Sequence, residues 1–342
     1  DFPTTSRMAG SPRLFNLCRE LSKHHRLVLA HFARSSEKGK PFSEDPDNTN
    51  VFSRTVELPL VSGFDRTSLS WVKRQYHRIM LEPFFSQRLR SPEDTQRLRE
   101  LINSLCTNEH IDIIYVDGIE MVQYLAVPAP VPVAVDLCDC LSLLYYQQSR
   151  RAHGLIRKTA LFLEAQSIAR WEKRIAGEAA LTIVISTQDE SSIKQLNPSA
   201  KTLVVQNGVD PNYFAPSSTS EKTANWPKLI FTGVMGYAPN ADAAVYFTYK
   251  VFPEVRKRFP EAEFWVVGAS PPPWVLKLAE EPGVQVTGRV DDVRDYLNRA
   301  DIFVCPLRLG TGMKNKIMAA MSMGLPVIAT ANSLNGLDFF PE

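Results

Sequence analysis

Short apolar runs alternate with helical patterns along most of this 342-residue chain. Buried runs of this length, separated by helices, are typical of parallel β-sheets whose strands are joined by crossover helices. The sequence therefore predicts an α/β fold. The strands are expected at 26–31, 111–116, 131–135, 181–185, 202–205, 228–232, 264–267, 284–287, 302–304 and 327–329.

Because a domain typically has about 150 residues, this length predicts roughly two domains. A turn cluster starts at Gln206, and a polar Ser-Thr stretch follows at 217–220. Such stretches mark domain boundaries, so we expect one domain over 1–206 and another over 207–342. No strand precedes the first helical pattern, and the chain stops just after a strand and a Gly turn. We therefore also expect a chain truncated at both ends.

Charge and cysteine content narrow the class of protein. The 39 Lys+Arg and 37 Asp+Glu leave a net charge of +2, which argues against nucleic acid as the main partner. No apolar run reaches the ~18 residues that a membrane span needs. Five cysteines, an odd number, fit free thiols in a reducing compartment. We expect a cytoplasmic protein that binds no nucleic acid.

A glycine-rich loop over 306–317 is the most informative segment, because it joins a buried strand to a helix. Free N–H groups at a helix N-terminus bind anions such as phosphate. Arg308, Lys314 and Lys316 add three cations. The spacing is neither a Walker A motif nor Gly-x-Gly-x-x-Gly, so it supports neither an ATPase nor a nicotinamide dehydrogenase. The alternative is an ordinary helix start with solvated lysines.

Two further strand ends belong to the same predicted sheet. Gly233 follows the strand at 228–232 and is followed by a Pro-Asn helix cap at Asn240, while Arg289 and Val290 follow the strand at 284–287. In a doubly wound sheet these loops meet at the carboxyl edge, where ligands bind. Three such loops on one edge favour a phosphate-containing ligand more strongly than any one of them.

The first domain carries weaker signals. Gly10 precedes a helix and could approach a ligand closely, although Ser11 also fits as an ordinary helix cap. Asp136 and Asp139 follow the strand at 131–135; Asp136 precedes a Cys-x-Cys pair and Asp139 lies within it. No second pair of Cys or His lies at ligand spacing, so we expect no metal site.

In order and spacing, these segments resemble the GT-B fold glycosyltransferases of family 4, closest to the bacterial sugar transferases associated with exopolysaccharide gene clusters. The resemblance is specific over 202–337 and weaker in the first domain, where it rests on Gly10, Arg13, Asp136, Asp139, Glu164 and Glu172. The matching residues of the second domain are Asn207–Asp210, Phe214, Pro216, Phe231, Gly233, Met235, Pro239, Asn240, Val266–Gly268, Val286–Val290, Ala300, Asp301, Pro306, Leu307, Lys316, Ile317, Gly324, Pro326 and Val327.

The resemblance implies two Rossmann-like domains that face a cleft, with a nucleotide-sugar donor held by the second and the acceptor site shaped by the first. It implies a hexosyltransferase that retains configuration at the anomeric carbon, needs no metal or cofactor, and serves cell-surface polysaccharide synthesis. The acceptor is then a glycan or a lipid-linked sugar. Helix N-termini and cations stabilise the negative charge that grows on the leaving diphosphate.

Carried over to this sequence, the resemblance assigns roles to particular residues. Asp139, Arg308 and Lys316 are the expected catalytic residues, and the backbone of Arg289 and Val290 meets the base. The expected donor-binding residues are Gly10, Ser11, Gly233, Arg289, Val290, Gly310, Thr311, Gly312, Lys314 and Lys316.

One departure from the family pattern leaves alternatives open. Family members carry a Glu that binds the ribose hydroxyls, and Ala319 stands in its place here, with Thr311 at the position of an earlier Glu. The second interpretation is therefore an inactive or weak relative that binds a nucleotide or a glycan. A sugar-nucleotide epimerase is a third, although its acid/base carboxylates and histidines are not recognisable.

A stretch at 66–90 interleaves six basic residues with aromatic ones. This pattern predicts peripheral contact with anionic headgroups of the inner membrane. The alternative is a helix that packs its apolar side on the first domain and exposes its basic side.

Overall fold

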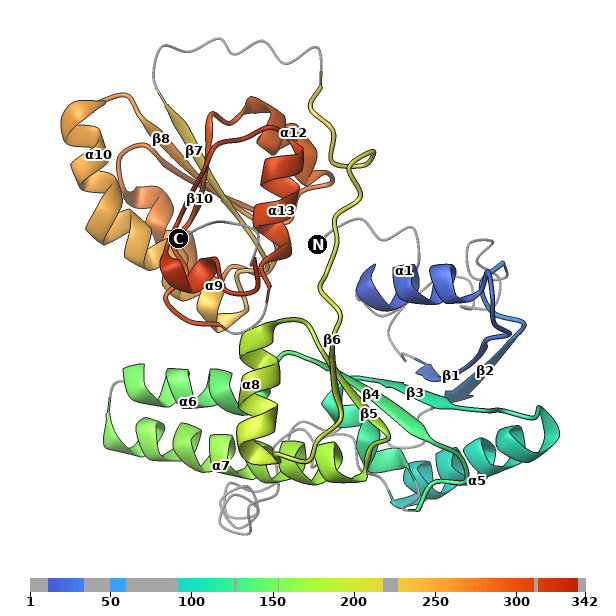
Figure 1. The fold of residues 1–342 in the computed structure, drawn as a ribbon. Coiled ribbons are helices and arrows are strands. Elements are labelled where there is room, and N and C mark those ends of the chain that lie inside the picture. Colours follow the sequence, from blue (N-terminus) through green and yellow to red (C-terminus); the bar gives the residue numbers. More distant parts are fainter. Residues whose placement is uncertain are drawn as a thin grey trace. The chain divides into compact units, whose positions relative to one another are not determined.

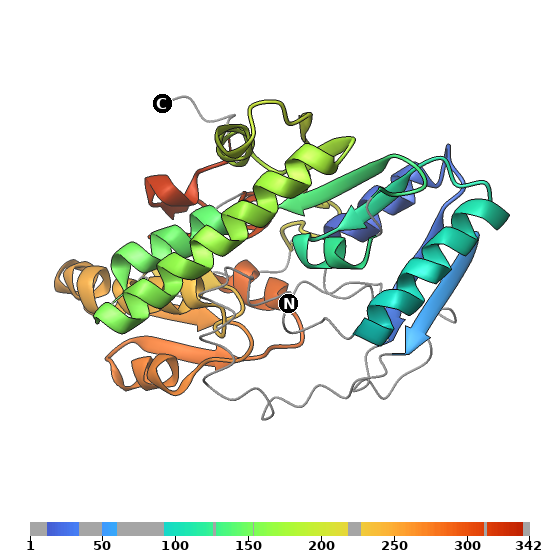
Figure 2. The ribbon, with the colours of Figure 1, turned by 90° about the horizontal axis from the view of Figure 1, so that it is seen from below.

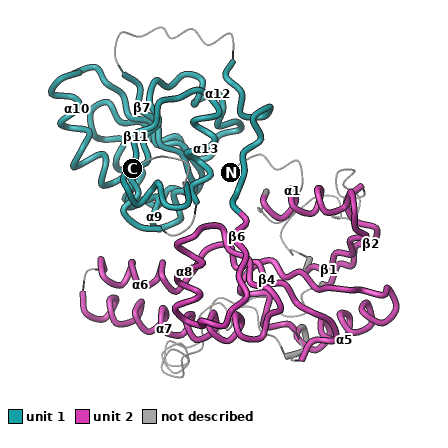
Figure 3. The backbone as a smooth tube through the Cα atoms, in the orientation of Figure 1, with its two compact units in different colours: residues 1–3, 206–342 teal, residues 4–205 magenta. Residues whose placement is uncertain are grey.

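The computed structural model describes residues 12–33, 50–59, 92–125, 128–152, 154–217, 227–310 and 313–337. The chain forms two compact units, of which one comprises residues 4–205 and the other is built from residues 206–342 (Figure 3). Each unit contains parallel β-strands accompanied by helices, so the predicted α/β fold class is confirmed. A cleft between the units stays a prediction.

The first unit holds a two-stranded parallel pair and a four-stranded parallel sheet in the order β3-β4-β5-β6 (Figure 1). Its strands are β1 (Val28–Ala33), β2 (Arg54–Pro59), β3 (Ile114–Asp117), β4 (Val133–Cys138), β5 (Leu181–Val184) and β6 (Thr202–Val204). Its helices are α1 (Pro12–Leu21), α5 (Pro92–Asn108), the 3-10 helix η2 (Ile119–Tyr124), α6 (Leu141–Arg151), α7 (Leu155–Glu178) and α8 (Thr187–Leu196).

The core of the first unit lies between its four-stranded sheet and its helices. Val135 and Val184 from the strands pack with Ile168 of α7 and Ile193 of α8, and all four are buried. Helix α8 begins where Ser186 accepts a hydrogen bond from the backbone N–H of Asp189. Strand β2 was not predicted, because its few apolar residues alternate with Arg54 and Glu57 over only six positions.

The second unit is a single five-stranded parallel sheet covered by helices (Figure 1). Its strands are β7 (Lys228–Thr232), β8 (Glu263–Val267), β9 (Val284–Gly288), β10 (Ile302–Cys305) and β11 (Val327–Ala329). Its helices are α9 (Ala238–Tyr246), the π-helix η3 (Phe247–Val251), α10 (Phe252–Arg258), α11 (Pro273–Leu276), η4 (Lys277–Glu280), α12 (Val293–Arg299), α13 (Asn315–Ser322) and η5 (Ala331–Ser333).

The strand order of this sheet is β11-β10-β7-β8-β9. The chain builds outward from β7 through β8 to β9, then returns to place β10 on the other side of β7. Ligands of such sheets bind outside the carboxyl ends of the strands, at the point where the order reverses. The register pairs Thr232 with Val267, so β7 and β8 end at the same level. The residues that follow these two strands therefore lie side by side.

Candidate functional site

Two glycines close the ends of β7 and β8. The N–H of Gly233 donates to the carbonyl of Val267 at 3.0 Å. Gly268 has φ +147°, and a Cβ built there would lie 1.9 Å from the carbonyl oxygen of Gly233. A Cβ on Gly233 would lie 2.7 Å from the Nζ of Lys316. The backbone can approach this closely only because both residues lack a side chain.

Lys316 lies in the first turn of α13, and its ammonium points to this glycine pair. Its Nζ donates a 2.7 Å hydrogen bond to the Oδ1 of Asn240 and lies 4.5 Å from the ring centroid of Phe231. The amide of Asn240 is held by its own Nδ2, which donates to the carbonyl of Val234 at 3.0 Å. Within the described part of the chain, no carboxylate pairs with Lys316.

The surroundings of Lys316 change its acidity. Protein atoms crowd the ammonium and remove it from water, and this desolvation lowers the pKa of Lys316 to about 8. The neighbouring charge of Lys314 acts in the same direction, while Cys305 opposes it. A desolvated cation without a carboxylate partner is costly on its own and favours the approach of an anion.

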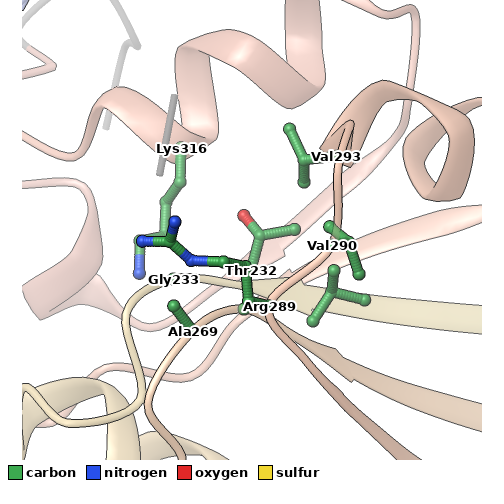
Figure 4. A pocket seen from close by; sticks show the side chains of 9 residues that line it. Thr232, Gly233, Ala269, Arg289, Val290, Val293 and Lys316 are labelled. Atoms are coloured by element: carbon green, nitrogen blue, oxygen red, sulfur yellow. The ribbon is translucent and has the colours of Figure 1, made fainter. Parts of the chain in front are cut away.

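A pocket of about 60 Å³ opens beside Lys316 (Figure 4). Two of its lining residues are cations and none is a carboxylate, and several valines supply an apolar side. The lining consists of Thr232, Gly233, Val267, Gly268, Ala269, Arg289, Val290, Val293 and Lys316. A volume of this size holds only a few water molecules, so the pocket suits one anionic end of a larger ligand. Gly233, Arg289, Val290 and Lys316 were singled out from the sequence.

Arg308 lies outside the lining of this pocket. Its guanidinium donates to both carboxylate oxygens of Asp242, at 3.1 and 2.5 Å, and lies 4.5 Å from the ring centroid of Tyr246. This bidentate pair occupies the planar edge with which arginine binds phosphate. The structure thus gives the two predicted catalytic cations different partners.

Other predicted donor-binding residues lie on the same loop or outside the described residues. Gly310 has φ +126°, a conformation that favours glycine, and buried Lys314 is the N-cap residue of α13. Ala319 is buried within α13 and presents only a methyl group. Gly10, Ser11, Thr311, Gly312 and the stretch 66–90 lie outside the described residues.

The carboxyl edge of the first unit's sheet carries a paired carboxylate. Asp136 is fully buried, and Arg13 of α1 contacts it through Nε at 3.0 Å and Nη2 at 2.9 Å. The Tyr115 hydroxyl and the Cys138 N–H also donate to Asp136, at 2.6 and 3.0 Å. Burial, with the charges of Asp136 and Glu120, raises the pKa of nearby Asp117 to about 6.

Asp139 follows an irregular end of β4. The pairing of β4 with β5 shifts between Asp136 and Cys138, and Cys138 has φ +57°, which is uncommon for a residue with a side chain. Bulges of this kind change the direction of the following residues and often occur beside active sites. The catalytic role expected for Asp139 stays a prediction.

The carboxylates beside the Cys-x-Cys segment bind the start of helix α6. The N–H of Cys140 donates to Asp189 at 3.0 Å, and Glu172 accepts from the hydroxyl and the N–H of Ser142 at 2.5 and 3.2 Å. Burial raises the pKa of Glu172. These carboxylates hold the start of α6. Among the described residues, no group of three or more His, Cys, Asp or Glu side chains could hold a metal ion.

The sequence interpretation missed two features of the second site. Asn240 was expected as a helix cap, but α9 begins earlier, with Tyr237 as its N-cap residue. That cap assignment is corrected: Pro239 suits the first turn of α9, and the Asn240 side chain binds Lys316 instead. Gly268 is part of the motif Val-Val-Gly in the sequence, but its contact with Gly233 could not be predicted because it depends on the register of β7 and β8.

The second unit is a parallel sheet with a cationic pocket at its switch point. Its similarity to known proteins indicates the class of protein to which such a unit belongs. Residues 226–337 match the family model described as Glycosyl transferases group 1. The match covers most of the second unit, which therefore carries a glycosyltransferase group 1 domain. No match was found among the curated proteins.

Solved structures share the fold of nearly the whole chain. Sucrose-phosphate synthase from Thermosynechococcus elongatus has a TM-score of 0.64 and 16% identity, over 95% of this chain and 75% of that one. HepE from Anabaena in complex with UDP has a TM-score of 0.60 and 14% identity, over 98% and 81%. A glycosyltransferase from Rickettsia africae has a TM-score of 0.55 and 11% identity, over 91% and 80%. The protein has the GT-B fold of these neighbours.

No described helix combines the length and the apolar character that crossing a bilayer requires.

Proposed function

We propose that this glycosyltransferase moves a sugar from a nucleotide-sugar donor to a glycan or lipid-linked acceptor in cell-surface polysaccharide synthesis. The observation that carries the proposal is the desolvated ammonium of Lys316, which lacks a carboxylate partner in the described residues and lines a pocket at the switch point. A solved neighbour with the same fold, HepE, binds UDP-glucose. An anionic diphosphate would supply the negative charge that is missing beside the Lys316 ammonium.

In the proposed reaction, the bond between the anomeric carbon and the diphosphate oxygen breaks, and its electron pair stays on that oxygen. The oxygen of the acceptor hydroxyl bonds to the anomeric carbon, and the hydroxyl proton leaves with the diphosphate. Lys316 stabilises the growing charge, so no metal is needed, and the configuration at the anomeric carbon is retained. Arg308 contributes once it leaves Asp242. A preorganised cation at this position is worth about 10²–10³-fold in rate, by analogy with other electrostatic contacts of active sites.

The remaining assignments of the proposal concern the donor and the first unit. The backbone of Arg289 and Val290 meets the base, and the loop from Gly310 to Lys316, including Thr311, Gly312 and Lys314, holds the diphosphate. Gly10 and Ser11 meet the phosphates from the first unit, where Asp139 acts on the acceptor side. The protein acts in the cytoplasm without a cofactor, and the stretch 66–90 makes peripheral contact with the inner membrane.

A second candidate is a relative that binds a nucleotide or glycan without turnover. The buried methyl of Ala319 favours it, because it cannot accept a hydrogen bond from a ribose. A lost charged hydrogen-bond partner weakens binding by about 1–3 kcal/mol. Ligand binding with no product formed on any acceptor supports this second function.

The test is a thermal-shift panel of UDP-, GDP-, ADP- and dTDP-sugars. A ligand at about 100 times its dissociation constant stabilises the native state by about 2.7 kcal/mol. Sugar release from the ligand that raises the melting temperature is then measured with and without EDTA. Equal rates are expected. Loss of activity in EDTA that Mn²⁺ or Mg²⁺ restores contradicts the metal-independent mechanism, and no shift with any nucleotide contradicts the donor site.

A further inference from the structure

Helices α6 and α7 of the first unit form an antiparallel hairpin, and Figures 1 and 2 both show them side by side. The 24 residues of α7 correspond to about 36 Å, whereas the strands of the sheet span at most about 20 Å. All of the buried residues of α7 lie between Glu164 and Ala176. The first nine residues of α7 therefore project beyond the core.

The end of this hairpin exposes apolar side chains. Leu155 is 80% exposed and Ile156 is 89% exposed. Polar residues are more usual at exposed positions of a helix start, so this apolar pair needs an explanation. Tyr146 of α6 and Phe162 of α7 are also exposed, and their ring centroids lie 6.4 Å apart. Phe162 lies two turns behind Leu155, so the aliphatic pair is at the tip and the aromatic pair behind it.

Four cations flank the aliphatic pair in the sequence. Arg150 and Arg151 end α6, and Arg157 and Lys158 begin α7; all four are exposed. No Asp or Glu occurs between residues 140 and 163. None of the four forms an ion pair with a described residue. We call the described residues 150–152 and 154–158 the hairpin tip.

The placement of these charges does not serve the stability of the helix. Cations at a helix N-terminus face the positive end of the helix dipole, where acidic residues are stabilising. Helix α7 has no acidic residue in its first turn, and its N-cap residue, Gly154, has no side chain to bind the free N–H groups. Two cations and these N–H groups all favour an external anion.

We propose that the hairpin tip docks on the surface of an anionic lipid bilayer, with Leu155 and Ile156 inserted among the acyl chains. The four cations then meet the phosphates of the headgroups. Two aliphatic side chains cover far less than the ~800 Å² per partner of a stable protein interface, but a small apolar insertion combined with basic residues suffices for peripheral membrane binding.

This surface differs from the stretch 66–90, and its docking does not depend on sugar transfer. Attachment through the tip confines the enzyme to the plane in which a lipid-linked acceptor diffuses. It does not change the donor pocket of the second unit. Vesicle binding and donor binding are therefore separate measurements, and either can fail alone.

The experiment floats the full chain with phosphatidylcholine vesicles and with vesicles that contain roughly one third phosphatidylglycerol, at low and high salt. We expect the protein on the anionic vesicles at low salt only. R157Q/K158Q should lower the partition coefficient by about tenfold or more, and L155S/I156S by about tenfold. L155W/I156W should raise it, because tryptophan favours the interface. K257Q/R258Q, with the same charge change at the exposed end of α10, is the matched control and should bind as wild type.

Several outcomes overturn the proposal. Wild-type binding by all tip variants assigns membrane contact to another surface, such as 66–90. If K257Q/R258Q lowers the partition coefficient as much as R157Q/K158Q does, the effect reflects net charge and not the hairpin tip. Absence of wild-type protein from anionic vesicles excludes docking, and a dimer that L155S/I156S dissociates assigns the tip to a second copy. A UDP-sugar thermal shift that persists in L155S/I156S shows that the donor site of the second unit is intact, so a failure of docking is distinguished from a failure of the proposed function.

Discussion

At the carboxyl edge of the first unit's sheet, the buried carboxylate of Asp136 receives hydrogen bonds from Arg13, Tyr115 and the backbone of Cys138. At the same edge of the second unit's sheet, the ammonium of Lys316 has one hydrogen-bond acceptor among the described residues, the neutral amide of Asn240. A buried charge with full partners contributes to the integrity of the fold, whereas one without an opposite charge is destabilising until a ligand arrives. The comparison separates a structural edge from a binding edge.

Removing the cation of the first edge should have the largest effect on stability. Arg13→Met leaves Asp136 buried without its counter-ion, which costs about 3–5 kcal/mol. The free energy of unfolding of the first unit, measured in urea by a probe in that unit, checks this value. Glu20→Met, which breaks an exposed pair with Lys23, is the control and should leave the unfolding free energy nearly unchanged. A loss below about 1 kcal/mol in Arg13→Met would remove the contrast between the two edges.

The same change at the second edge should separate activity from stability. Lys316→Met removes a desolvated cation without a carboxylate partner, so the unfolding free energy should stay equal or rise. Sugar transfer should fall by about 10²–10³-fold, or about 2.7–4 kcal/mol. Turnover and urea denaturation are measured on the same preparation. Unchanged transfer would place the diphosphate elsewhere.

A side chain at Gly233 should destabilise the second unit and weaken nucleotide binding at this edge of its sheet. Gly233→Ala puts a Cβ 2.7 Å from the Lys316 Nζ and the Asn240 Nδ2, at φ +155°. Strain of this kind costs about 1–3 kcal/mol, and displacement of Lys316 should weaken nucleotide binding as well. Calorimetric titration measures the affinity. Gly208→Ala, where a Cβ meets nothing within 4 Å, is the control.

The acidity of Lys316 predicts a dependence on pH. Its pKa of about 8 in the folded state lies below the 10.5 of an exposed lysine. Between these values the unfolded chain binds more protons, so the contribution of Lys316 makes stability rise with pH from about 8 to 10.5. Diphosphate affinity should fall over the same range by up to about tenfold per pH unit, because the neutral amine does not bind anions.

Titration calorimetry in buffers of different ionisation enthalpy, near pH 8.5, should detect proton uptake on binding. Lys316→Arg keeps its charge at these pH values and should show neither this uptake nor the decline in affinity. Identical proton uptake in the variant would assign the proton to another group.

The exposed pair of the second unit should give the smallest effect. Arg308→Gln breaks a part-exposed ion pair with Asp242, which contributes about 0–1 kcal/mol to stability. Because the pair already occupies the guanidinium, transfer should fall by roughly tenfold or less. Steady-state rates of sugar transfer measure this effect. A decrease in rate as large as that of Lys316→Met would mean that Arg308 contributes as much to the site as Lys316.

Much of the architecture could be predicted from local patterns. The strands at 228–232 and 327–329 begin and end where expected. A short buried strand depends on residues close in sequence, which explains this success. Strand β2 and the π-helix η3 depend on packing with distant segments, and nothing in the local pattern indicated them.

The residue types, their order and the glycine at each strand end come from the sequence alone, and they already place cations and glycines on the edge of one sheet. They do not distinguish Lys316 from Arg308, which carry the same charge and lie eight positions apart between β10 and the first turn of α13. Their partners, Asn240 and Asp242, lie two residues apart on α9. Such side chains face different directions on a helix, so the amide meets one cation and the carboxylate meets the other. Contacts separated by 76 and 66 residues in the chain exist only once the sheet has formed, and they decide which cation is left for a ligand.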